Sequence, residues 1–156
     1  MRVDVEKNLL EKGITIPEPA AKGGLYRPCR EFGENLAYVS GCGCSVGGVP
    51  VAGKLGIDFT VEEGQLHARN SMLNVLAALK AEIGDLSRVK RVVKILVFVA
   101  SADDFYQQPQ VANGASQLLV DVFGEKAGLP TRSAVGVNVL PGNLPVEIEA
   151  IFELRD

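Results

Sequence analysis

Three charged residues near the end of the sequence are the strongest candidates for chemistry. Arg132 begins a run of small and apolar residues, and Glu147 and Glu149 lie within an alternating apolar segment. An arginine can hold a carboxylate through two parallel hydrogen bonds. A carboxyl group in a partly dry site can transfer protons near neutral pH. Because carboxylates are disfavoured inside strands, two interpretations are open. Either all three residues face water or pair across strands, or they form a carboxylate-binding arginine with a buried acid.

A glycine-rich stretch contains two of the three cysteines. Residues 41–56 lack the GxxxxGK[ST] spacing of a phosphate-binding loop, so we expect a connecting loop or hairpin. Cys42 and Cys44 are too few and too close together for a structural zinc site, and we expect no metal. The odd number of cysteines favours reduced thiols. Cys42 could be a reactive thiol beside a pocket, although an unreactive cysteine is the simpler interpretation.

The chain has one histidine, His67, which excludes any mechanism that needs a pair of histidines. It follows Glu63 by four residues, on the polar side of an expected helix. We therefore predict a solvated surface histidine without a catalytic role.

A few helices must position these candidates. Thr60 and Glu63 fit a capping box, and the residues that follow have one apolar face at helical periodicity. Pro109 is suited to the first turn of a further helix. The predicted helices, each followed by a glycine, cover residues 3–12, about 60–83 and about 109–123.

Strands are expected where β-branched residues gather or where apolar and polar residues alternate. The predicted strands cover residues 36–40, 89–100, 134–139 and 146–154. The segment 140–145 has turn composition, so the last two strands should pair as a hairpin. Residues 16–24 should form an extended, irregular arm.

This order of elements indicates an α+β fold with a mixed or antiparallel sheet and two helices packed on one face. The other face of the sheet would be open, and proteins often cover such a face by forming oligomers.

Composition sets further limits. A chain of 156 residues with 47% hydrophobic residues is expected to form one domain. The longest apolar run, residues 95–100, is far below the ~20 residues that span a membrane. The net charge is −3 without a basic block, so we expect no nucleic-acid partner. The first residues show no apolar stretch of secretory length, and we expect a cytoplasmic protein.

The C-terminal residues resemble the signature of the RidA/YjgF family. The matching segments are PTRSAVGV at 130–137, LP at 140–141 and VEIEA at 146–150. Tyr26, the segment 38–41, the helix with Asn74 and the strand 89–99 follow in that family's order. The resemblance covers residues 24–154.

The resemblance implies a chorismate-mutase-like domain of the bacillus type over residues 24–156, preceded by a helix and extended arm over 1–23. It implies a homotrimer with clefts between subunits. The implied activity is that of a 2-iminobutanoate/2-iminopropanoate deaminase-like hydrolase, which converts reactive 2-enamino and 2-imino acids, such as 2-aminoacrylate, to 2-keto acids and ammonia. No cofactor is expected.

By matching position, the resemblance implies that Arg132 holds the substrate carboxylate and Glu147 positions or activates the water. Tyr26 would line the cleft from a neighbouring subunit. The implied substrate-binding residues are Tyr26, Ser40, Gly41, Arg132 and Ser133. The sequence departs from the family at Ala134, where many members carry cysteine.

The expected hairpin has a geometric consequence. A turn near residues 142–143 would pair Arg132 with about residue 153, roughly 20 Å along the strands from Glu147. We therefore expect that the Arg132 and Glu147 of one site come from different subunits.

Two other functions remain open. The same cleft could bind small carboxylates or 2-keto acids without catalysis. A ribonuclease is the second alternative, but the acidic net charge and the lack of a basic groove argue against it.

Overall fold

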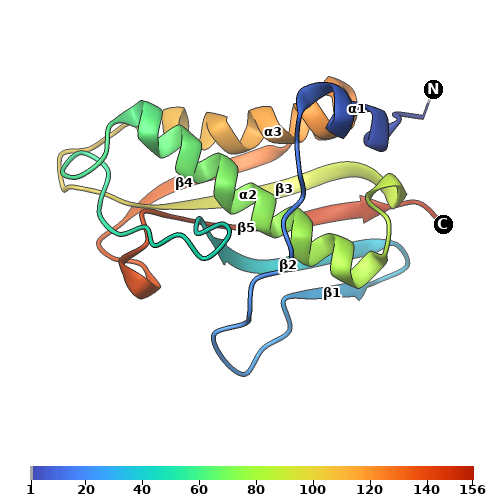
Figure 1. The fold of residues 1–156 in the computed structure, drawn as a ribbon, viewed down its shortest axis with the longest axis horizontal. Helices are drawn as coiled ribbons and strands as arrows, with labels where there is room; N and C mark the ends of the chain where they lie inside the picture. The colour runs from blue at the N-terminus through green and yellow to red at the C-terminus, as the bar shows by residue number, and fades with distance from the viewer. Residues whose placement is uncertain (1) are drawn as a thin grey trace.

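Five strands form one mixed sheet in the order β1-β2-β5-β3-β4 (Figure 1). The structure is a computed structural model that describes residues 2–156. The strands are β1 (Cys29–Phe32), β2 (Leu36–Gly43), β3 (Val89–Ala100), β4 (Thr131–Val137) and β5 (Val146–Leu154). Neighbouring strands are antiparallel except β3 and β4, which run parallel.

The helices begin and end close to the residues that the sequence marks. They are α1 (Val5–Lys12), α2 (Val61–Ile83) and α3 (Gln108–Gly128), and 3₁₀ turns cover Leu86–Arg88 and Pro141–Asn143. The predicted capping box is confirmed, since the Glu63 N–H donates to Thr60 Oγ1 over 3.2 Å and the Thr60 N–H donates to Glu63 Oε1 over 3.3 Å. Gly13 ends α1 in the left-handed region, at φ 63°.

The predicted stop at Gly124 is confirmed as a break in helical geometry, but one further helical turn follows it. Gly124 leaves helical geometry, with φ 78° and ψ 163°, but the helix resumes and ends at Gly128. Ala127, in the added turn, packs against the core. This contact stabilises a turn that the local sequence does not predict.

The predicted hairpin between the last two strands is also wrong. β4 pairs with β3, and β5 lies between β2 and β3. Because parallel neighbours need a long crossover, α3 makes the connection from β3 to β4. The residues of β5 on the helix-covered face are all buried, as expected of a central strand: Val146, Ile148, Ala150, Phe152 and Leu154. Ile151, on the other face, is half-buried.

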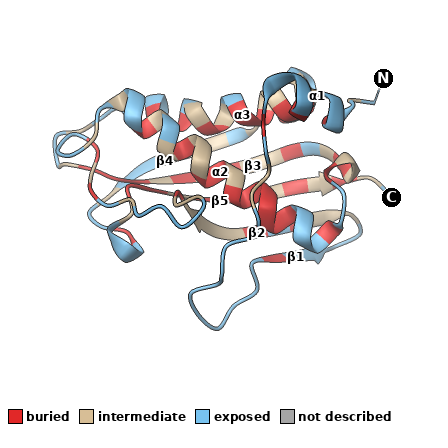
Figure 2. Ribbon diagram, viewed as in Figure 1, coloured by how far each residue is buried: buried red, intermediate tan, exposed pale blue. Residues whose placement is uncertain are grey.

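Helices α2 and α3 lie on the same face of the sheet, as predicted (Figure 1). Most of the buried residues of both helices belong to the core that they form with the sheet (Figure 2). On the opposite face, which we call the open face, no helix among residues 2–156 covers the strands, and Tyr38 and Val135 are exposed. Within the described residues, no helix has the length and apolar character needed to cross a membrane.

The N-terminal segment is packed onto this framework. In α1, the side chain of Asn8 donates to the carbonyl of Val122 in α3 over 2.8 Å. The chain then crosses α2 to reach β1 (Figure 1). Ile14 is buried, but residues 18–28 are exposed. From here on, the name arm refers to residues 18–28. The predicted irregular segment therefore lies against α2.

Candidate functional site

Glu147 lies on the open face of β5, directly against Gly41 of β2. A Cβ atom on Gly41 would lie 2.9 Å from Glu147 Cδ, so glycine is needed for this close approach. Burial raises the pKa of Glu147, and the charge of Glu149 raises it further. Within residues 2–156, the carboxylate of Glu147 has no ion pair with a lysine or arginine. A half-buried carboxyl group of this kind is suited to proton transfer.

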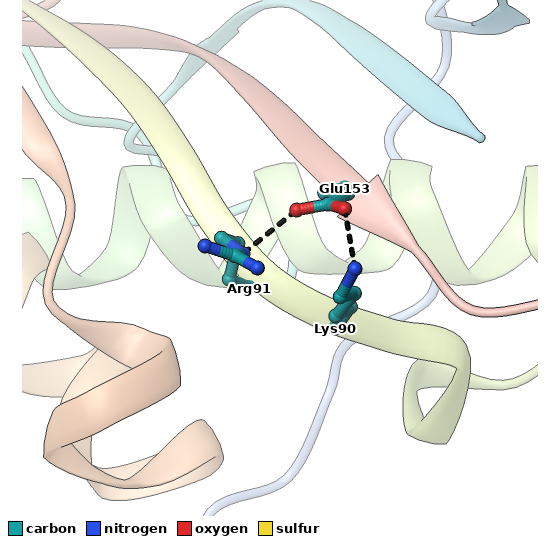
Figure 3. Close-up of polar contacts among 3 residues, drawn as sticks. All are labelled: Lys90, Arg91 and Glu153. Atoms are coloured by element: carbon teal, nitrogen blue, oxygen red, sulfur yellow. Dashed lines mark hydrogen bonds and ion pairs between the residues drawn. The ribbon is translucent and has the colours of Figure 1, made fainter. Parts of the chain in front are cut away.

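The other carboxylates on the same face of β5 have partners. Glu153 accepts from Lys90 Nζ at 2.8 Å and pairs with Arg91 Nε at 2.7 Å (Figure 3). The hydrogen bond from Lys90 lowers the pKa of Glu153, assisted by both positive charges. Glu149 accepts from Tyr38 Oη over 3.1 Å. Glu147 therefore differs from Glu153 in charge compensation, although both belong to one strand.

A cavity of about 320 Å³ lies on the other side of Gly41, between the arm, the end of β2 and the C-terminal half of α2. Strand β1 pairs with β2 as far as Cys29 and Val39, and the Ser40 N–H still donates to the Pro28 carbonyl over 2.8 Å, so the β2 edge beyond Ser40 forms one wall. Four residues proposed from the sequence line this cavity: Tyr26, Ser40, Gly41 and Cys42.

The predicted pocket thiol is a lining residue but is held in the thiol form. Burial, with the nearby charge of Glu147, raises the pKa of Cys42 to about 12. Burial likewise raises the pKa of Cys29 to about 11. Both sulfurs stay protonated at neutral pH, which favours the interpretation of unreactive cysteines. All three cysteines are free.

Arg132 lies on β4, and its side chain points toward α3. Its Nη1 donates to Asn113 Oδ1 over 2.8 Å and to Ser116 Oγ over 3.1 Å. Both acceptors are neutral, and no carboxylate of residues 2–156 pairs with this guanidinium. Arg132 is therefore a positioned cation whose charge is uncompensated.

One chain does not bring Arg132 and Glu147 together. Arg132 is opposite Ile95 and shares the helix-covered face, whereas Glu147 is opposite Phe98 and lies on the open face. The distance expected from the hairpin rested on the wrong pairing. The observed register places their backbones two strands and three residues apart, about 14 Å. Ser133 also lies apart from the cavity and accepts from Lys94 Nζ over 2.8 Å.

The prediction of a solvated His67 is wrong. Both of its ring nitrogens are buried without a hydrogen-bond partner, and its ring packs edge-on against Phe59 at 4.5 Å between centroids. Burial lowers the pKa of His67. The missed signal is Phe59, an apolar residue directly before the capping Thr60, which is typical of a side chain that folds back onto the helix.

Two buried polar residues of α2 support the end of β2. Asn74 Nδ2 donates to the carbonyls of Gly43 and Ser45, each over 2.8 Å, and Ser71 Oγ donates to the carbonyl of Cys42. Sequence reasoning missed this role. The sequence contains a signal for it, because Ser71 and Asn74, three residues apart, interrupt the apolar face of the helix. In the part of the chain that the structure describes, no three histidine, cysteine or acidic side chains gather as a metal site.

Comparison with known proteins identifies the family. The family model described as YjgF/chorismate mutase-like, putative endoribonuclease, matches residues 6–152. The protein TCP17 of Trypanosoma cruzi is 46% identical over 154 residues, which are 97% of this chain and 95% of that protein. Among solved structures, Atu1372 from Agrobacterium tumefaciens superposes with a TM-score of 0.87 at 42% identity, covering 96% of this chain and 92% of that one.

A more distant structure contains a ligand. TdcF from E. coli, solved with bound serine, has a TM-score of 0.60 and 27% identity, covering 91% of this chain and 96% of that one. The match of the family model over most of the chain agrees with the C-terminal signature that carries Arg132 and Glu147. The chain therefore belongs to the RidA/YjgF family and has its chorismate-mutase-like fold.

Proposed function

We propose that this protein hydrolyses reactive 2-enamino and 2-imino acids to 2-keto acids and ammonia, in clefts between the subunits of a homotrimer. Membership of the family supports binding of a small molecule. The serine bound to the relative TdcF is an amino acid with a free carboxylate, which fits a substrate of this class.

The observation that carries the proposal is a pair of opposite charges, each without an ionic partner. Arg132 has only neutral acceptors, and Glu147 has no cation among residues 2–156. A guanidinium of this kind can bind the carboxylate of an imino acid. A carboxylate with a raised pKa can accept a proton from the attacking water.

The reaction needs few further groups from the protein. An enamino acid becomes the imine when its terminal carbon takes up a proton. Glu147 takes a proton from water as the oxygen bonds to the imine carbon, and it returns this proton to the nitrogen, which gives a neutral tetrahedral carbinolamine. The same carboxylate then takes the hydroxyl proton of the carbinolamine and delivers it to the amine nitrogen as the C–N bond breaks. Both protons of the water leave on ammonia, and its oxygen becomes the keto oxygen of the product. Orientation by Arg132 supplies much of the remaining acceleration.

The placement of the two charges argues for a shared site. Arg132 and Glu147 lie on opposite faces of one sheet, about 14 Å apart between backbones, so one small substrate cannot contact both within a chain. The open face also leaves Tyr38 and Val135 exposed. In the proposed trimer a neighbouring copy covers part of this face and supplies the second charge.

The test is release of 2-keto acid from enzymatically generated 2-aminoacrylate. We expect Arg132→Ala to lower the rate at least about 100-fold, because the substrate is no longer held and oriented. Glu147→Gln should abolish hydrolysis but retain keto-acid binding. Arg30→Ala, at an exposed arginine on β1, is the matched control and should behave as wild type.

Equal rates for wild type and Arg132→Ala would refute the proposal. If wild type binds keto acids without turnover, and Glu147→Gln changes nothing, the protein is a carboxylate-binding protein and not an enzyme.

A further inference from the structure

The cavity beside Gly41 is larger than the smallest substrates of the proposed reaction require. At about 320 Å³ it would hold roughly ten water molecules, whereas the side chain of 2-aminoacrylate is a single methylene. Ser40 and Gly41 line the cavity, and Gly41 lies directly against the carboxyl group of Glu147, the proposed proton-transfer group. The cavity is therefore available to a group that extends from a substrate carbon bound near Gly41.

The walls of the cavity are mainly apolar. The arm contributes Pro19, Ala20 and Ala21, and α2 contributes Ala78 and Ala81. Short side chains at these positions create the space. An apolar group placed there would leave water without losing hydrogen bonds.

Several polar side chains of the lining already have partners. The side-chain nitrogen of Asn74 donates twice to backbone carbonyls, and Ser40 Oγ donates to the Arg27 carbonyl over 2.8 Å. Lys22 Nζ donates to the Tyr26 carbonyl over 3.3 Å.

The one carboxylate of the lining, Glu82, pairs with Arg27 at 3.9 Å. A polar substituent that bonds to the Asn74 nitrogen, the Ser40 hydroxyl or Glu82 would have to displace one of these partners.

We propose that this cavity receives the side chain of the substrate, and that the protein selects 2-imino acids with branched aliphatic or aromatic side chains over those with a methyl group. The inference rests on the proposed function, because it places the reacting carbon near Gly41. The arm forms the roof of the cavity, so the residues before β1 take part in determining specificity.

The experiment measures calorimetric affinity for three 2-keto acids, the products of the reaction: pyruvate, 4-methyl-2-oxopentanoate and phenylpyruvate. We expect wild type to bind the two larger acids at least about tenfold more tightly than pyruvate, since a single methylene in an apolar pocket already contributes a factor of about 10 or more. The hydrolysis rates of the corresponding imino acids should follow the same order.

Two variants fill the cavity from different walls. Ala81→Leu adds volume from an exposed helical position, where leucine is a good helix former, and Ala21→Leu adds it from the exposed arm. Both should remove the preference for the larger acids and leave pyruvate binding unchanged. Ala52→Leu, at an exposed alanine outside the cavity, is the matched control.

Equal affinity for all three acids, or an equal loss for all three in both filled variants, would overturn the assignment. Size selectivity that is erased by Ala81→Leu, in a protein that hydrolyses no imino acid, would leave the cavity assigned and refute the deaminase proposal. Hydrolysis of imino acids without size selectivity would support the deaminase proposal and refute the cavity assignment. Failure to bind any keto acid would refute both proposals.

Discussion

Two regions of the molecule differ in which partner of opposite charge is missing: the region around β2 and β5, and the region around β4 and α3. The first has a half-buried carboxyl group, Glu147, and an apolar cavity, but no cation that pairs with this carboxylate among residues 2–156. The second has a cation, Arg132, fixed by the neutral side chains of Asn113 and Ser116, and no carboxylate of residues 2–156 pairs with it.

Each region is suited to half of a reaction. Arg132 can orient a substrate carboxylate, and Glu147 can manage the protons of a water molecule. Glu153 shows that this chain can neutralise a carboxylate on β5 with two cations (Figure 3). The uncompensated charges at Arg132 and Glu147 are therefore local features of the two regions, and the proposed reaction requires the two regions to meet between subunits.

The largest expected effect comes from mixing two inactive variants. If the regions meet between subunits, co-expressed Arg132→Ala and Glu147→Gln chains form some sites that have both native residues. Random assembly should restore about one quarter of wild-type activity. The measurement is keto-acid release by the co-purified mixture.

The control mixture is Arg132→Ala with the double variant Arg132→Ala/Glu147→Gln, which contains no native Arg132 and should stay inactive. If the first mixture is no more active than this control mixture, Arg132 and Glu147 act within one chain.

A smaller effect is expected from Gly41→Ala, which changes the first region alone. The new Cβ would lie 2.9 Å from Glu147 Cδ and must displace the carboxyl group. We expect a 10- to 100-fold loss of kcat, because catalytic groups tolerate little displacement, with keto-acid binding through Arg132 largely kept. Gly23→Ala is the matched control, since nothing lies within 4 Å of its Cβ. Wild-type kcat in Gly41→Ala would argue against a catalytic Glu147.

The smallest effect concerns pH. Glu147 must be ionised to accept a proton from water, so activity falls as pH drops through its pKa. The charge of Glu149 is the second cause, after burial, of the raised pKa of Glu147. Glu149→Gln should therefore lower this pKa and move the acidic limb of the kcat profile to lower pH.

Glu153→Gln is the control, because Lys90 and Arg91 already compensate that charge. If the acidic limb of the kcat profile is unchanged in Glu149→Gln, or moves to higher pH, the result contradicts the role given to Glu147.

Local signals in the sequence predicted most of the individual elements. The capping box at Thr60 and the glycine after α1 act through neighbouring backbone groups, so residues near each helix end suffice to predict them. Strand β1 escaped prediction because three of its four residues are exposed, which leaves no alternating pattern.

Pairing between distant segments was harder to predict. The turn at residues 140–145 correctly indicates a change of direction, but turn chemistry does not determine which strand lies beside β5. That choice depends on β2 and β3, which are far away in the sequence. His67 was misplaced for a related reason, since a helical wheel ignores Phe59 outside the helix.

The candidate site was predicted residue by residue, through resemblance to the family. The grouping of Tyr26, Ser40, Gly41 and Cys42 around one cavity is visible only in the structure. The cavity exists because the arm passes over the free edge of β2. No local pattern in residues 18–28 predicts the course of this segment.

The position of β5 also constrains how the chain acquires its structure. β5 is the last strand in the sequence, yet it alone joins β2 to β3 in the sheet. During synthesis, the β1–β2 pair and the β3–β4 pair can each form, but they remain two separate ribbons with unpaired edges until residues 146–154 leave the ribosome. The complete sheet therefore forms only after β5 has emerged, and the segment that carries Glu147 is also the one that closes the fold.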